Sequence, residues 1–292
     1  MRTKKALIIL LFLLAFVDFF LVREKKMHYK AISFIAVGDT GTGEEEQYRI
    51  STVMKKTCDT IHCTAFILLG DNIYPKGVSS IADPQFQTKF ELIYRDIFKP
   101  FYVAFGNHDH LGCIECEIAY STMSAKWKLP NYYYKQSFED LVDLFVIDTE
   151  KLNQEQVDWA IKELQQSKAK WKILVGHHPF VAYDSRHESA TEEQKYLLEK
   201  ILCNKNIRPT IYIAGHAHNL EDVGDFCNVR LLVSGGGGAP LGALIPNKAP
   251  FASSEYGFMS IVASEENIKI EFINIEGKSL HAWIKYEALS KY

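Results

Sequence analysis

The chain has 292 residues, of which 47% are hydrophobic, 13% aromatic and 24% charged. This length accommodates one large α/β domain or two small ones, and the composition is that of an ordinary globular protein without low-complexity segments or solenoid-type repeats. The formal charge is −3, and −7 without residues 1–26, which hold six Lys/Arg and two Asp/Glu. The chain therefore lacks the excess of basic residues that is typical of nucleic-acid-binding proteins. Any positive charge that attracts phosphate must be confined to a local site.

The N-terminus carries an apolar run, Ala6–Val22, that follows three basic residues and is interrupted only by Asp18. A basic stretch before an apolar run is typical of an export signal. The run is long for a signal-peptide core and just long enough to span a bilayer, so residues 1–26 are predicted to be a signal peptide or an N-terminal membrane anchor. We therefore expect an exported protein that is secreted, periplasmic or membrane-anchored. Any membrane contact is expected only through this segment, with residues 27–292 outside the cytoplasm.

Short apolar runs alternate with amphipathic patterns along the rest of the chain. The runs predict buried strands at 31–37, 65–69, 101–105, 142–147, 172–175, 210–214 and 230–233. The amphipathic patterns predict helices at 45–58, 84–98, 153–167 and 191–202. Residues 258–263 and 268–275 are predicted to form a closing hairpin. Strands that alternate with helices indicate an α/β fold with a largely parallel sheet, and the late strands suggest a second sheet packed on it.

Two segments have the character of loops. Residues 106–130 hold few periodic apolar side chains, and long loops inside compact domains are often functional. Residues 234–240 include four consecutive glycines, which either let the backbone approach a ligand closely or form a flexible turn.

The six cysteines fit an exported protein, because an even number in an oxidising compartment suggests disulfides. The simplest pairing by proximity is Cys58–Cys63, Cys113–Cys116 and Cys203–Cys227, although the sequence does not fix the connectivity. The second pair also has the spacing of half a zinc site, but no other CxxC completes one.

Five short motifs each begin where a predicted strand ends. They are Gly38-Asp39-Thr40-Gly41, Gly70-Asp71-Asn72-Ile73-Tyr74, Gly106-Asn107-His108-Asp109, Leu174-Val175-Gly176-His177 and Gly215-His216-Ala217-His218. In open α/β sheets the ligand crevice lies at the carboxyl ends of the strands, so the motifs are expected to converge. Together they offer more carboxylate, amide, phenol and imidazole ligands than one tetrahedral metal takes. They suit two metals that share a bridging carboxylate and act on a phosphate ester.

Any one of these motifs alone is more often a helix cap or an ordinary loop histidine. The ordered set, however, resembles that of the calcineurin-like metallophosphoesterases, and Tyr74 in its GDxxY motif makes it similar to the small, tartrate-resistant type of purple acid phosphatase. The resemblance runs from about Ile32 to the C-terminus. It implies a four-layer α/β/β/α sandwich over residues 27–292, with a dimetal site at the edge of the sheets.

The resemblance also implies which residues hold the metals. The ligands of the first metal, Fe(III), would be Asp39, Asp71, Tyr74 and His218. The ligands of the second, a divalent iron, zinc or manganese, would be Asn107, His177 and His216, with Asp71 bridging. A phenolate with carboxylates suits a hard trivalent ion, and amide and imidazole ligands suit a softer divalent one.

Three further residues are candidates for catalysis by the same resemblance. His108 would contact the substrate phosphate or relay a proton to the leaving alkoxide. Asp109 would orient His108, and His187 lies where related enzymes often place a substrate-facing histidine. One ambiguity concerns the metal ligands themselves: His178 directly follows His177, so either fits the motif, and the spacing from Gly176 favours His177.

The predicted function is acid phosphatase activity, in which a metal-bound hydroxide attacks a phosphomonoester without a covalent phosphoenzyme. A phosphodiesterase or nucleotide hydrolase on the same site is an alternative, and a non-catalytic receptor or scaffold that keeps the fold is another. The organic group of the substrate is expected to be recognised by loops such as 111–136 and 240–257. No nucleic-acid partner is expected, and the sequence leaves the oligomeric state open.

Overall fold

The computed structural model of the protein describes residues 31–187, 189–246 and 249–287. The predicted signal or anchor, residues 1–26, lies outside these ranges. Within them, no helix has both the length and the apolar character needed to cross a membrane.

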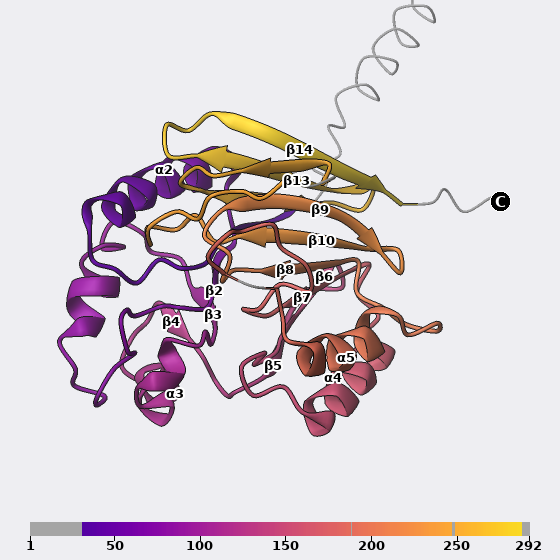
Figure 1. Ribbon diagram of the computed structural model, residues 1–292, viewed down its shortest axis with the longest axis horizontal. Coiled ribbons are helices and arrows are strands. Elements are labelled where there is room, and N and C mark those ends of the chain that lie inside the picture. Colours follow the sequence, from indigo (N-terminus) through magenta and orange to yellow (C-terminus); the bar gives the residue numbers. More distant parts are fainter. Residues whose placement is uncertain (1–30, 188, 247–248, 288–292) are drawn as a thin grey trace, which may run out of the picture. The chain divides into compact units, whose positions relative to one another are not determined.

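The first of two mixed sheets combines strands from the start of the described chain, purple to magenta in Figure 1, with strands from its end, which are yellow. Its strands are β1 (Ile32–Val37), β2 (Ala65–Leu69), β3 (Phe101–Ala104), β4 (Trp127–Lys128), β12 (Gly257–Ala263), β13 (Asn267–Asn274) and β14 (Ser279–Tyr286), in the order β14-β13-β12-β1-β2-β3-β4. β1 pairs parallel with β2 and antiparallel with β12. The late strands therefore extend the first sheet and do not form a second one. The prediction of a separate late sheet was wrong because sequence patterns do not reveal long-range pairing.

The second sheet comes from the middle of the chain. Its strands are β5 (Tyr134–Phe138), β6 (Val142–Val146), β7 (Trp171–Val175), β8 (Ile211–Ala214), β9 (Leu220–Phe226), β10 (Val229–Ser234) and β11 (Phe251–Ser253), in the order β11-β9-β10-β8-β7-β6-β5. Its central pairs β6–β7, β7–β8 and β8–β10 are parallel, and its edges are antiparallel. The carboxyl ends of β7 and β8 consequently lie at one edge of this sheet.

Alternating side chains of the second sheet separate two apolar layers. Leu144 and Val146 of β6 belong to the core shared with the first sheet. Phe145, between them, points the other way and packs with Leu164 and Leu198 of the helices α4 (Gln154–Gln166) and α5 (Glu192–Leu202). Side chains of successive strand residues point to opposite faces, so this sheet lies between the first sheet and the helix pair.

The remaining long helix covers the first sheet. α2 (Glu45–Ile61) buries Ile50 and Met54 in the same core as β1 and β12. The order of layers is therefore α2, first sheet, second sheet and the α4–α5 pair. This confirms the predicted four-layer α/β/β/α sandwich.

The predicted helices at 45–58, 153–167 and 191–202 are confirmed as α2, α4 and α5. Asn153 caps α4, since its side chain accepts a hydrogen bond from the backbone N–H of Gln156. The helix predicted at 84–98 is much shorter than expected, because helical backbone covers only residues 85–91, most of it the π-helical turn η1 (Gln87–Glu91). Phe90 of this turn and Tyr94 after it pack around Phe101, the first residue of β3.

The predicted loop 106–130 contains more structure than expected. It holds a 3₁₀ turn, η2 (Asp109–Leu111), and a short helix, α3 (Ile114–Tyr120), before β4. The three disulfides are those of the proximity pairing, Cys58–Cys63, Cys113–Cys116 and Cys203–Cys227. Because the second pair is oxidised, its sulfurs do not form half of a zinc site.

Candidate metal centre

The seven predicted metal ligands follow five strand ends, drawn from both sheets. Those after β1, β2 and β3 are Asp39, Asp71, Tyr74 and Asn107, and those after β7 and β8 are His177, His216 and His218. Three of them have left-handed backbone conformations, with φ values of 59° for Asp39, 52° for Asp71 and 66° for His216. Such strain in residues other than glycine is concentrated at functional sites, where the surrounding structure enforces it.

One group of ligand atoms surrounds the phenol of Tyr74. Its hydroxyl lies 2.8 Å from Asp71 Oδ2, 3.1 Å from Asp39 Oδ1 and 3.1 Å from His218 Nε2. His218 Nε2 is also 3.4 Å from Asp39 Oδ1. The potential metal-binding atoms of two carboxylates, a phenol and an imidazole thus face one another.

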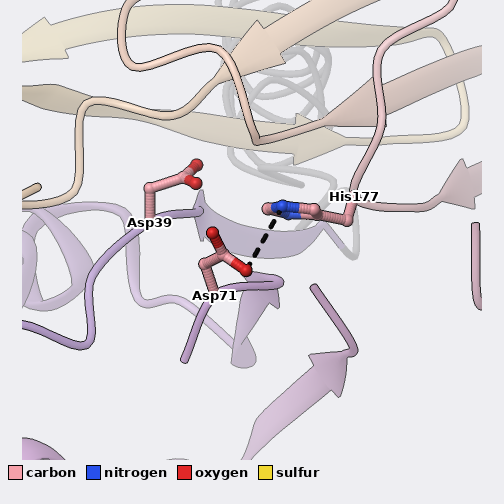
Figure 2. A group of neighbouring side chains, drawn as sticks. All are labelled: Asp39, Asp71 and His177. Carbon is pink, nitrogen blue, oxygen red and sulfur yellow. Dashed lines mark ion pairs between the residues drawn. The ribbon is translucent and has the colours of Figure 1, made fainter. Parts of the chain in front are cut away.

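A second group surrounds the side chain of Asn107. Its Oδ1 lies 3.1 Å from both His177 Nε2 and His216 Nδ1, which are 3.3 Å apart. Asp71 joins this group through its other oxygen, since Oδ1 is 3.4 Å from His177 Nε2 (Figure 2). Asp71 therefore presents one carboxylate oxygen to each group, which is the arrangement of a bridging ligand.

Backbone carbonyls fix the orientation of two ligand histidines. His177 Nδ1 lies 2.8 Å from the carbonyl oxygen of Leu69, and His218 Nδ1 lies 2.9 Å from that of Pro240. A carbonyl only accepts hydrogen bonds, so each Nδ1 carries a proton and Nε2 is the ring nitrogen available to a metal. The donor set and its orientation fit a pair of metal ions.

The two groups also perturb one another's protonation. Burial by itself would lower the pKa of His177, but the charge of Asp71 outweighs burial and raises that pKa to about 10. Burial and the nearby His177 lower the pKa of His216 to about 2. Burial, together with Asp39 and Asp71, raises the pKa of Tyr74 well above its usual range. Without a bound cation, one proton is therefore held between His177 and Asp71.

The structure separates the two adjacent histidines of the fourth motif. His177 is fully buried and faces the ligand groups, whereas His178 Nδ1 lies 3.0 Å from Thr149 Oγ1 and its Nε2 lies 3.6 Å from Glu150. The geometry thus brings His177, the residue favoured by its spacing, into the cluster.

His108 lies on the accessible side of the cluster. Its side chain is 33% exposed, and its Nε2 is 3.9 Å from Asp71 Oδ2. Its Nδ1 is 2.7 Å from the carbonyl oxygen of Pro75, to which it donates a hydrogen bond. The ring is therefore held in place while its other nitrogen faces the ligand groups.

Asp109 was predicted to orient His108, but its carboxylate has other partners. It accepts hydrogen bonds from the backbone N–H groups of Gly106, at 2.8 Å, and Asn72, at 3.0 Å. It also accepts one from the side chain of Asn72, at 2.8 Å. Asp109 thus ties the loop that carries Asn107 to the loop that carries Asp71, and it is a positioning residue.

His187 lies beside the first ligand group. Its ring centroid is 3.9 Å from that of His218, and its Nδ1 is 3.3 Å from Asp184 Oδ2. The same Asp184 oxygen accepts the backbone N–H of His218 at 2.9 Å. Asp184 therefore positions both histidines. The sequence did not single it out, because it is a lone carboxylate in a loop without a motif.

The comparisons with known proteins agree with this geometry. Residues 32–220 match the family model described as calcineurin-like phosphoesterase. Purple acid phosphatase 3 of Arabidopsis thaliana is 29% identical over 289 residues, covering 87% of this chain and 77% of that protein. Tartrate-resistant acid phosphatase type 5 of Homo sapiens is 30% identical over 295 residues, covering 86% and 89%.

Solved structures share the fold at lower identity. The structure titled "GAP50 the anchor in the inner membrane complex of Plasmodium" has a TM-score of 0.76 and 21% identity, covering 87% of this chain and 88% of that one. The structure of PhoD has a TM-score of 0.59 and 14% identity, covering 88% and 70%. The family match and the relatives together establish that the chain belongs to the calcineurin-like phosphoesterase family and is a homologue of the purple acid phosphatases.

Proposed function

We propose that this protein is an exported acid phosphatase that hydrolyses phosphomonoesters at a dinuclear metal centre. The observation that carries the proposal is the position of Asp71, whose two oxygens each face a complete ligand group. The relatives that match most of the chain are named acid phosphatases, which supports the same activity.

The residues around the centre suit hydrolysis of a phosphate ester. When bound, two metal ions supply Lewis acidity, lower the pKa of a coordinated water and clamp the phosphate. His108 is positioned to hydrogen-bond the phosphate or to give a proton to the leaving alcohol, because its Nδ1 is anchored on Pro75 and its Nε2 faces the cluster. His187 is held by Asp184 on the other side, next to His218.

The two groups favour different metals. The first contains two carboxylates and a phenol, which form a hard, anionic set suited to Fe(III). The second contains an amide and two imidazoles beside the shared carboxylate, which suits divalent iron, zinc or manganese. The assignment of Fe(III) to the group of Tyr74 is part of the proposal.

Export is supported by the cysteines. The three disulfides account for all six cysteines, and structural disulfides persist in oxidising compartments. N-terminal sequencing of the mature protein would show whether residues 1–26 are removed or retained as an anchor.

The proposal is tested by metal analysis, a visible absorption spectrum and an ester assay on the purified protein. We expect two metals per chain, one of them iron, with a tyrosinate-to-iron band that disappears in Tyr74→Phe. We also expect faster turnover of para-nitrophenyl phosphate than of the bis-ester. A band that survives in Tyr74→Phe would remove Tyr74 from the ligand set.

The other outcomes distinguish the alternatives. Faster turnover of the bis-ester would identify a phosphodiesterase on the same site. Two metals without the visible band would keep a dimetal hydrolase but contradict Fe(III) at Tyr74. A protein that binds no metal and hydrolyses neither ester would be a non-catalytic scaffold.

A further inference from the structure

A cleft of about 690 Å³ lies beside the second ligand group. His216 belongs both to this ligand group, through its Nδ1, and to the lining of the cleft. The cleft and the proposed metal centre are therefore separated only by the imidazole ring of His216. Its lining also includes Glu150, Lys151, Leu152, His178 and Glu193.

Hydrogen bonds within and between its two walls shape the cleft. One wall is the segment 150–153 before α4, and the other is the start of α5. Gln194 of α5 donates from its side chain to the carbonyl oxygen of Thr149 at 2.8 Å. Asp148 accepts the backbone N–H of Glu150 at 3.1 Å. The cleft is thus a built feature of the second sheet and its helices.

The floor of the cleft presents a hydrogen-bond donor. Thr149 Oγ1 accepts the backbone N–H groups of His177 and His178, at 3.1 and 2.9 Å, which occupies both of its lone pairs. Its own proton is then donated to His178 Nδ1, 3.0 Å away. Because Nδ1 of His178 accepts this hydrogen bond, Nε2 is the ring nitrogen that is left to donate, and it lies 3.6 Å from Glu150.

Nine of the ten described residues that line the cleft are polar, and they include both donors and acceptors. Leu152 is the one aliphatic residue among the described residues that line the cleft. Glu150 and Glu193 supply carboxylates, while Lys151 and His178 supply donors. An aromatic or alkyl group bound against these side chains would displace water from them without replacing its hydrogen bonds, which costs binding free energy. A group with several hydroxyls, each of which both donates and accepts, satisfies both kinds of atom.

We propose that this cleft binds the alcohol part of the substrate and selects phosphomonoesters of polyhydroxylated alcohols, such as sugar phosphates. This inference rests on the proposed phosphatase function. It places recognition of the organic group on residues 150–153 and on Ser189, Thr191, Glu193 and Gln194, in addition to the loops 111–136 and 240–257 that the sequence suggested.

The test compares two esters of similar chemical reactivity, a hexose 6-phosphate and n-hexyl phosphate. Both are phosphates of primary alcohols, so a difference in kcat/KM reports recognition of the alcohol. We expect the wild-type protein to favour the hexose ester by about tenfold or more, the effect of one or two well-placed hydrogen bonds. In Glu193→Ala the ratio of the two kcat/KM values is expected to fall at least about threefold.

Glu192→Ala is the matched control, because Glu192 is the neighbouring residue in the first turn of α5 and does not line the cleft. Its ratio is expected to equal that of the wild type. Equal kcat/KM for the two esters in the wild type, or the same ratio in Glu193→Ala as in the control, would overturn the inference. Failure to hydrolyse para-nitrophenyl phosphate would instead contradict the proposed function, so the two failures are distinguishable.

Discussion

At the scale of single residues, Asp71 is the side chain shared by both ligand groups. Asp71→Asn keeps the size of the side chain but removes its charge and replaces one oxygen with an NH₂ group, which does not bind a metal. We expect the variant to lose both metals and to lower kcat by roughly a hundredfold or more. Metal content and turnover of para-nitrophenyl phosphate measure the two effects.

The control for this variant is Asp59→Asn, since Asp59 is exposed on α2 and pairs with Lys55. It is expected to keep both metals and full activity. If Asp71→Asn retained both metals at full occupancy, Asp71 would not be the bridging ligand.

The proton held by His177 makes metal binding depend on pH. The pKa of His177 is raised to about 10 when no cation is bound, so the ring is protonated at neutral pH, and a metal must displace that proton. Lower pH therefore weakens metal binding, and higher pH, toward 10, strengthens it. Calorimetric titration of the metal-free protein with Zn²⁺ in two buffers of different ionisation enthalpy should show release of about one proton or more. Identical enthalpies in both buffers would contradict the assignment.

At the scale of secondary-structure elements, α3 buries a carboxyl group without a partner among the described residues. Glu117 is fully buried, and neither of its side-chain oxygens has a hydrogen bond there. Burial, reinforced by Asp109 and Asp71, raises its pKa well above its usual range. The contribution of Glu117 to stability therefore becomes more unfavourable as the pH rises above about 4.3, the pKa of a glutamate in the unfolded chain.

Glu117→Gln removes this titration while keeping the shape of the side chain. We expect the variant to raise the free energy of unfolding at pH 7 by about 1–3 kcal/mol, with the gain shrinking toward pH 4. Urea unfolding at both pH values measures it. Glu199→Gln, at an exposed position of α5, is expected to leave stability unchanged. An equal gain at pH 4 and pH 7 would show that ionisation is not the cause.

At the scale of the whole molecule, the proposed centre joins the two sheets. The ligands before residue 108 follow strands of the first sheet, and the three histidines follow strands of the second. Because bound metals stabilise only the folded state, they should raise Tm by about 5–10 °C over the metal-free protein. Calorimetry before and after treatment with a chelator, followed by reloading, measures the shift. A Tm that does not change with metal content would contradict a centre that joins the sheets.

The sequence predicted the parts of this arrangement that depend on local patterns. The fully buried strands, such as β1 and β6, appear as short apolar runs and were found. The half-exposed strands β9 and β14 carry mixed residues and were missed. The ligand motifs were visible because each follows a buried strand. The sequence did not predict the pairing of β1 with β12 or the role of Asp184, since both depend on contacts between distant parts of the chain.

The antiparallel pairing of β1 with β12 also has a consequence for biosynthesis. The last ligand, His218, is made long after the first, and β12 begins only at Gly257. A growing chain that has just emerged past His218 still lacks the strand that covers one edge of β1. Exposed strand edges favour aggregation before folding is complete. Insertion of the metals is therefore expected to follow synthesis of nearly the entire polypeptide.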